Sequence, residues 1–128
     1  MKLLVVDDHP GIVHILSSVV TCLGHQADEA GGGFEAMERL KGNRYDVVIT
    51  DAEMPGGDGI DLCKYIKSRI PDVYVVGMSG NLHALQSLRD AGADVCLLKP
   101  FGMDELNEAI EKRTHSSLDG AMSLRSVA

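Results

Sequence analysis

Val47-Val48-Ile49-Thr50-Asp51 is the stretch that decides the fold class, because an uninterrupted run of β-branched residues ends in an acid. Its apolar part is Val47–Ile49, and comparable runs occur at Leu3–Val6, Val73–Val76 and Val95–Leu98. Apolar runs that are continuous rather than alternating are typical of strands buried on both faces of a parallel sheet. The sequence therefore predicts four such strands.

A fifth strand and five helices complete the pattern. The segment Gln26–Ala30 mixes polar and small residues, which predicts a partly exposed strand at a sheet edge. Apolar residues spaced by three or four positions mark the helices, and they are Ile12, Leu16, Val19 and Leu23; Phe34, Met37 and Leu40; Leu62, Cys63, Ile66 and Ile70; Leu82, Leu85 and Leu88; and Met103, Leu106 and Ile110. Alternating strands and helices predict an α/β domain, (βα)5, whose parallel sheet is covered by helices on both faces.

Length and charge narrow the classes of function. The chain has 128 residues, which suits one domain, and its 19 acidic against 12 basic residues give a formal net charge of -7. We expect no direct binding to nucleic acid or to an anionic membrane surface, since both need a basic patch. No apolar run approaches the about 18 residues of a membrane span, and Asp7 and Asp8 come too early for a signal peptide.

The three cysteines lack CxxC spacing, which indicates reduced thiols in a cytoplasmic protein. Cys22 and Cys63 fall on the apolar faces of predicted helices. We therefore expect both side chains in the core.

Polar side chains follow four of the predicted strands at their carboxyl ends. Asp7 and Asp8 follow the first strand, Asp51 the third, Ser79 the fourth and Lys99 the fifth. In an open parallel sheet, ligands bind outside the carboxyl ends of the strands, at the point where the strand order reverses. We therefore expect these side chains to share one site.

Three carboxylates, a hydroxyl and an ammonium group suit phosphoryl chemistry. Two carboxylates about 4 Å apart repel by about 4 kcal/mol at an effective dielectric constant of about 20. A cluster of three therefore raises a pKa or recruits a cation, and oxygen ligands suit Mg²⁺. A carboxylate can attack phosphorus to form an aspartyl phosphate, whose oxygens a metal, a lysine and a hydroxyl can hold.

Four motifs carry these residues, and they are Leu4-Val5-Val6-Asp7-Asp8; Asp51-Ala52-Glu53-Met54-Pro55 with Gly59 beyond; Met78-Ser79-Gly80; and Leu98-Lys99-Pro100-Phe101. In order and spacing they resemble the signatures of response-regulator receiver domains of two-component signalling, in particular the single-domain, chemotaxis-regulator-like kind. The resemblance implies a doubly wound, flavodoxin-like sheet with strand order 2-1-3-4-5. We expect the receiver domain over residues 1–113 and a short tail or helix extension over 114–128.

The resemblance implies how the site handles phosphate. Asp51 is the expected acceptor of a phosphoryl group from a histidine kinase or a phosphotransfer protein. Ser79 donates its hydroxyl to one phosphoryl oxygen and Lys99 pairs with another, with a cis Lys99–Pro100 bond aiming the lysine at the site. The chain is then a switch that acts on an output protein or domain rather than an enzyme, with at most Mg²⁺-dependent phosphorylation and dephosphorylation of itself.

The same resemblance implies a Mg²⁺ site. Asp8 binds the ion directly and Asp7 assists. Asp51 and the backbone carbonyl of Glu53 complete the protein ligands. The side chain of His9, although adjacent in sequence, is expected to face solvent.

Two features leave alternatives open. Receivers commonly carry Tyr or Phe three residues before the lysine, where this chain has Cys96. A phosphorylation-independent interaction module with the same fold is therefore the second interpretation. The stretch Gly77-Met78-Ser79-Gly80-Asn81 also nearly matches the G-x-S-x-G motif of α/β-hydrolases, although the final glycine is missing.

Overall fold

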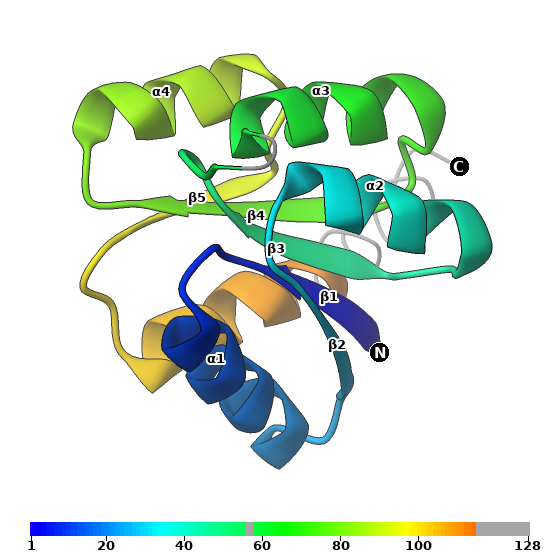
Figure 1. Cartoon of the computed structure of the whole chain (residues 1–128). Coiled ribbons are helices and arrows are strands. Elements are labelled where there is room, and N and C mark those ends of the chain that lie inside the picture. The colour runs from blue at the N-terminus through cyan, green and yellow to red at the C-terminus, as the bar shows by residue number, and fades with distance from the viewer. Residues whose placement is uncertain (56–57, 115–128) are drawn as a thin grey trace, which may run out of the picture.

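A computed structural model describes residues 1–55 and 58–114 of the chain. Its labelled elements (Figure 1) are β1 (Lys2–Val6), α1 (Pro10–Cys22), β2 (Gln26–Ala30), α2 (Gly33–Gly42), β3 (Val47–Asp51), α3 (Gly59–Arg69), β4 (Tyr74–Ser79), α4 (Leu82–Asp90) and β5 (Val95–Leu98). A fifth helix, which carries no label in the figure, runs through residues 103–114. The alternation of strands and helices is as predicted, whereas the predicted tail lies outside the described residues from position 115 onward.

The five strands form one parallel sheet in the order β2-β1-β3-β4-β5. This confirms the expected order 2-1-3-4-5 and the edge position of β2. Val6 pairs with Thr50, and Asp51 pairs with Met78. The carboxyl ends of β1, β3 and β4 therefore meet at one edge of the sheet, where the strand order reverses.

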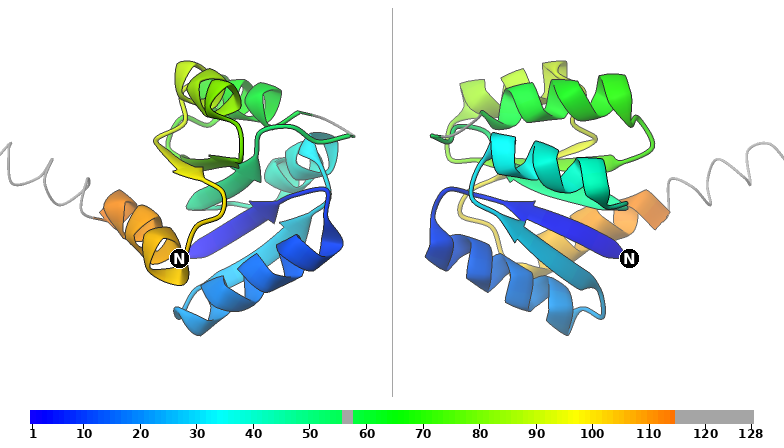
Figure 2. Two further views of the ribbon diagram at one scale, coloured as in Figure 1. Left: turned by 90° about the vertical axis from the view of Figure 1, so that its left-hand side faces the viewer. Right: turned by 45° about the vertical axis from the view of Figure 1, so that its right-hand side comes forward.

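Helices cover both faces of this sheet, as Figures 1 and 2 show. The helices α2, α3 and α4 lie on one face, and α1 and the helix over 103–114 lie on the other. On β1, Leu4 and Val6 belong to the first buried cluster, whereas Leu3 and Val5 belong to the second. Successive side chains of a strand point to opposite faces, so the continuous apolar run serves both layers. None of the helices within the described ranges is long and apolar enough to cross a membrane.

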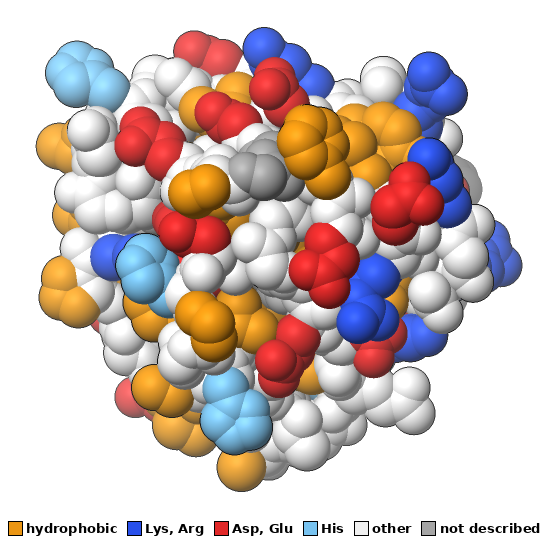
Figure 3. Space-filling model, in the orientation of Figure 1, with side chains coloured by type: hydrophobic (Ala, Val, Ile, Leu, Met, Phe, Trp, Pro, Cys, Tyr) orange, Lys and Arg blue, Asp and Glu red, His pale blue; other side chains and the backbone are white. Residues whose placement is uncertain are grey.

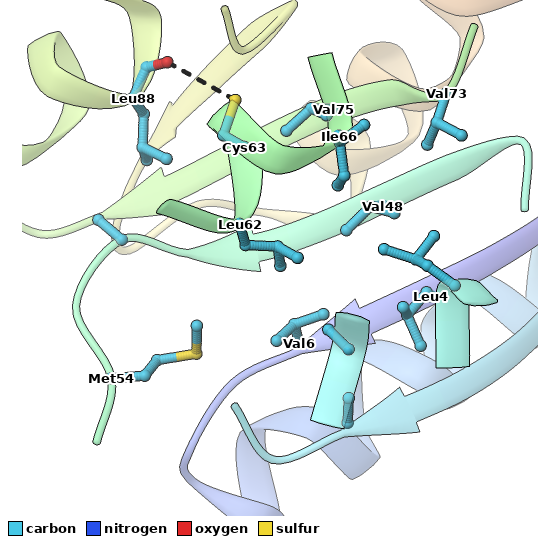
Figure 4. Packing of buried hydrophobic residues seen from close by; sticks show 14 of the residues in the cluster. Leu4, Val6, Val48, Met54, Leu62, Cys63, Ile66, Val73, Val75 and Leu88 are labelled. Atoms are coloured by element: carbon cyan, nitrogen blue, oxygen red, sulfur yellow. Dashed lines mark hydrogen bonds between the residues drawn. The ribbon is translucent and has the colours of Figure 1, made fainter. Parts of the chain in front are cut away.

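Packing beneath α3 holds this helix against the middle of the sheet (Figure 4). Leu62 of α3 and the strand residues Val48 and Val75 are fully buried in one cluster. Burying each such side chain contributes about 1.5–3 kcal/mol. Cys63 is also buried there, and its thiol donates a weak hydrogen bond to the carbonyl oxygen of Leu88 at 3.9 Å. The position of α3 is thereby tied to β3, β4 and α4.

The start of α3 lies directly against the end of β3. The backbone N–H of Gly59 donates to the carbonyl oxygen of Ala52 at 2.9 Å. A Cβ atom at Gly59 would overlap the backbone oxygen of Asp51. The side chain of Asp58 caps the helix by accepting from the N–H of Ile60. The absence of a side chain at position 59 therefore permits the close approach that shapes the loop after β3.

Two predictions about burial are wrong. The run Val95–Leu98 forms an edge strand that is only partly buried, and Leu98 is 47% exposed. Cys22 is exposed, whereas Cys63 is buried as expected. In both cases the local pattern indicates an apolar segment, but its place at the sheet edge or at the end of a helix decides how much of it is covered.

Candidate functional site

The ammonium group of Lys99 lies between two carboxylates at the carboxyl edge of the sheet. Its Nζ atom is 3.2 Å from Oδ2 of Asp7 and 3.4 Å from Oδ1 of Asp51. Asp7 directly follows β1, and Asp51 is the last residue of β3. The backbone N–H of Lys99 donates to the carbonyl oxygen of Ser79 at 2.9 Å, which holds the loop after β5 against the end of β4. The Lys99–Pro100 bond is cis, as predicted.

Burial and charge shift the two carboxylates in opposite directions. Burial raises the pKa of Asp7, but the backbone N–H of His9 and the charge of Lys99 more than offset it, so that this pKa lies below its ordinary value. Burial also raises the pKa of Asp51, which Lys99 lowers and the charge of Asp7 raises again, with a net increase. Asp51 is therefore the more basic of the two carboxylates.

Asp8 and His9 extend the site beyond Asp7. Nδ1 of His9 lies 3.2 Å from Oδ1 of Asp7 and 3.3 Å from Oδ1 of Asp8. The His9 side chain is 67% exposed, so it does face solvent, but it also contacts both acids. Sequence reasoning missed this contact, although the position of His9 directly after the acid pair was a signal for it.

The acids at the end of β1 fit a divalent cation. Oδ1 of Asp8 is buried and has no hydrogen-bond partner among the described residues. An unpartnered buried oxygen of this kind is unfavourable by about 1–3 kcal/mol, and more when charged, unless a cation compensates it. One ligand atom from each of Asp7, Asp8 and His9 can be chosen so that all lie within 4.8 Å of one another. Among the described residues, these three side chains form a group that can hold a metal.

Ser79 and Glu53 occupy the rim of the same edge. Ser79 is buried and ends β4, next to Met78, which pairs with Asp51. The Ser79 Oγ atom accepts a hydrogen bond from the backbone N–H of Asn81 at 3.1 Å. Glu53 is exposed in the loop after β3. The structure thus joins Asp7, Asp51 and Lys99 directly. Ser79 ends the neighbouring strand β4, and Glu53 follows Asp51 by two residues.

The surface around the site combines acids with an apolar groove. Figure 3 shows acidic side chains over the loops that follow β1 and β3, and hydrophobic side chains over α1. On α1, Ile12 is 36% exposed and Ile15 is 63% exposed. A groove beside them is lined by Ile12, Ile15, Leu16, Met78, Lys99, Pro100 and Phe101. Lys99 lines the groove and also pairs with Asp7 and Asp51, so the groove adjoins the carboxylate site.

Comparisons with known proteins agree on one family. The family model of the response regulator receiver domain matches residues 3–111. Sporulation initiation phosphotransferase F of Bacillus subtilis (strain 168) is 34% identical over 113 residues, which cover 87% of this chain and 91% of that protein. The sensor histidine kinase RcsC of Salmonella typhi is 36% identical over 112 residues, which cover 86% of this chain but 12% of that protein.

Solved structures show the same likeness. The response regulator TrrA from Thermotoga maritima, in complex with Mg²⁺ and BeF, superposes with a TM-score of 0.82 and 33% sequence identity. That alignment covers 88% of this chain and 97% of the other. A response regulator from Chloroflexus aurantiacus gives the same TM-score at 29% identity. The likeness therefore extends over the sheet, its helices and the carboxyl edge that carries the acids.

Proposed function

Because the chain belongs to the response regulator receiver domain family, we propose that its Asp51 accepts a phosphoryl group from a histidine kinase or a phosphotransfer protein. The observation that carries this proposal is the Lys99 ammonium group between Asp7 and Asp51. A cation beside the acceptor neutralises charge as a phosphoryl group arrives. The proposed receiver domain comprises residues 1–113 and works as a two-component switch rather than as an enzyme.

In the proposed reaction, an Asp51 oxygen attacks the phosphorus atom of a phosphohistidine. A P–O bond forms, the P–N bond breaks, and its electron pair returns to the departing imidazole. The Lys99 ammonium group exchanges its contact with Asp51 for one with a phosphoryl oxygen and keeps its ion pair with Asp7. The Ser79 hydroxyl donates to a second phosphoryl oxygen. Each group needs only a small displacement, because all of them already lie at one edge of the sheet.

Mg²⁺ is the proposed cofactor. When bound by Asp7, Asp8, Asp51 and the backbone carbonyl of Glu53, the ion offsets the repulsion between the carboxylates and the incoming phosphoryl oxygens. The buried, unpartnered Oδ1 of Asp8 supports this proposal. So does the Mg²⁺ in the related TrrA structure.

The apolar groove beside α1 suits the partner that delivers the phosphoryl group. We propose that a helix carrying the phosphorylated histidine packs in this groove, against Ile12, Ile15 and Phe101. Exposed apolar side chains next to a charged site are typical of an interaction surface. Contact there brings the partner's imidazole to the edge of the sheet where Lys99 and Asp51 lie.

We propose that phosphorylation is signalled to the output partner by a change in the position of α4. Asn81 caps α4 with its side chain, and its backbone N–H donates to Ser79 Oγ. A displacement of Ser79 toward a phosphoryl group therefore pulls on the start of this helix. The thiol of Cys96, which stands where receivers commonly carry a ring, donates to the carbonyl oxygen of Leu85 at 3.6 Å. This contact links β5 to α4, so that helix position rather than a ring swing carries the signal.

Labelling with acetyl phosphate and Mg²⁺ tests the proposed acceptor. Wild-type protein should gain one phosphoryl group, measured by intact mass, and should gain none when the metal is chelated before the donor is added. Asp51→Asn should gain none. The control Asp61→Asn changes an exposed acid on α3 and should behave as wild type.

Undiminished labelling of Asp51→Asn would refute the assignment. A wild-type protein that takes no label and does not respond to beryllofluoride would instead support the phosphorylation-independent interaction module. Hydrolysis of acyl esters that is lost in Ser79→Ala would support the hydrolase interpretation.

A further inference from the structure

Three consecutive residues at the end of β1 present donor atoms toward one another. Lys99 pairs with Oδ2 of Asp7, and Oδ1 of Asp7 is the oxygen beside His9. Nδ1 of His9 is 3.2 Å from that oxygen and 3.3 Å from Oδ1 of Asp8. Neighbouring ligands of an octahedral ion with bonds of about 2.1 Å stand about 3 Å apart. The spacing of the nitrogen from both oxygens thus matches adjacent positions around one ion.

We infer that Nδ1 of His9 is a ligand of the metal held by Asp7 and Asp8, and that it makes this site prefer a divalent transition metal to Mg²⁺. The inference rests on the proposed function, because it concerns the same metal site. Carboxylate and water ligands suit Mg²⁺, whereas an imidazole nitrogen favours ions such as Ni²⁺, Co²⁺ and Zn²⁺. One nitrogen among oxygens therefore changes the selectivity of the site without removing its capacity for Mg²⁺.

The backbone holds the imidazole over the acids. The N–H of His9 donates to Oδ1 of Asp7 at 3.0 Å, so the peptide and the ring converge on the same carboxylate. Pro10, the first residue of α1, restricts the preceding residue to extended geometry, and His9 has φ -95° and ψ 107°. The ring is thus oriented by local structure before any ion arrives, which lowers the entropy lost on binding.

The exposed side of the ring allows either tautomer. With the proton on Nδ1, the ring donates to Oδ1 of Asp7. With the proton on Nε2, Nδ1 presents a lone pair at the same point. Because the side chain is 67% exposed, Nε2 can hydrogen-bond to water in either form. Exchange between the two roles therefore needs no movement of the backbone.

Calorimetric titration with Mg²⁺ and with Ni²⁺ tests the inference on three proteins. Wild-type protein should bind Ni²⁺ at least tenfold more tightly than Mg²⁺. His9→Gln should weaken Ni²⁺ binding at least tenfold and change Mg²⁺ binding less than twofold. His14→Gln is the matched control, because His14 lies on α1 near Glu29 (3.8 Å), and it should change neither affinity.

Pulsed electron paramagnetic resonance with Mn²⁺ supplies an independent readout. Wild-type and His14→Gln proteins should show coupling to a histidine nitrogen, and His9→Gln should show none. The inference fails if His9→Gln leaves Ni²⁺ binding unchanged, weakens both metals equally, or keeps the nitrogen coupling. Labelling of Asp51 by acetyl phosphate with Mg²⁺ should persist in the control His14→Gln. Loss of labelling in the wild type would therefore count against the proposed function, whereas unchanged Ni²⁺ affinity in His9→Gln would count against the inference alone.

Discussion

Replacing Gly59 by alanine tests the close packing that positions Asp51, the proposed phosphoryl acceptor. A Cβ at this position would overlap the backbone oxygen of Asp51 and lie 2.9 Å from Oγ1 of Thr50. Thr50 is fully buried, so neither neighbour can turn aside as the end of a flexible side chain would. The substitution must therefore displace the start of α3 or the end of β3, which carries Asp51.

The expected loss of stability follows from three terms. Displacement weakens the hydrogen bond from Gly59 to Ala52, which is 2.9 Å long and contributes about 1 kcal/mol. Forcing an additional carbon into a packed position costs about 1–3 kcal/mol. The better helix propensity of alanine returns up to about 1 kcal/mol. The free energy of unfolding should therefore fall by about 1–4 kcal/mol.

Urea unfolding followed by circular dichroism measures this change, with Gly11→Ala as the control. Gly11 lies in α1, where a Cβ meets nothing within 4 Å, so Gly11→Ala should leave stability unchanged or raise it by up to about 1 kcal/mol. Gly59→Ala should also slow labelling by acetyl phosphate, because Asp51 moves relative to Lys99. If Gly59→Ala is as stable as Gly11→Ala and is labelled at the wild-type rate, Gly59 does not position Asp51.

Three further predictions concern residues away from the proposed acceptor. Burial raises the pKa of Tyr45 to about 12, and so does the Asp28 carboxylate to which its hydroxyl donates at 2.6 Å. This shift should contribute about 3 kcal/mol to the free energy of unfolding below a pH of about 10, and the contribution should disappear as the pH rises to about 12. Denaturant titrations should show this loss, and Tyr45→Phe should abolish it. Burial raises the pKa of the Cys63 thiol to about 11, so iodoacetamide should label exposed Cys22 in the native protein but Cys63 only after unfolding, and equal labelling by mass spectrometry would contradict this. Beryllofluoride with Mg²⁺ should change the backbone amide chemical shifts of α4 more than those around Cys96 on β5. A thiol is small, so a change of its rotamer exposes or hides much less apolar surface than the movement of an aromatic ring. The reverse pattern would argue against output through α4.

The order of elements and the chemistry of the carboxyl edge could be predicted from the sequence. Continuous apolar runs, helical spacings and helix boundaries such as Pro10 are properties of neighbouring residues, which local physics determines. The same holds for the acids and the lysine placed directly after strands, since parallel strands end at a common edge. The strand order and the cis bond before Pro100 followed from the family resemblance, and the structure confirms both.

Only the tertiary structure decided which atoms meet and which surfaces stay exposed. Lys99 reaches Asp7 across a sequence separation of 92 residues, and burial of that carboxylate depends on every layer packed around it. Leu98 is exposed because no further strand lies beside β5 in the described sheet. The apolar run alone does not indicate whether its strand lies at an edge. The contact of His9 with two carboxylates depends on the turn between β1 and α1. Long-range packing and backbone direction determine such distances, and neither is a property of neighbouring residues alone.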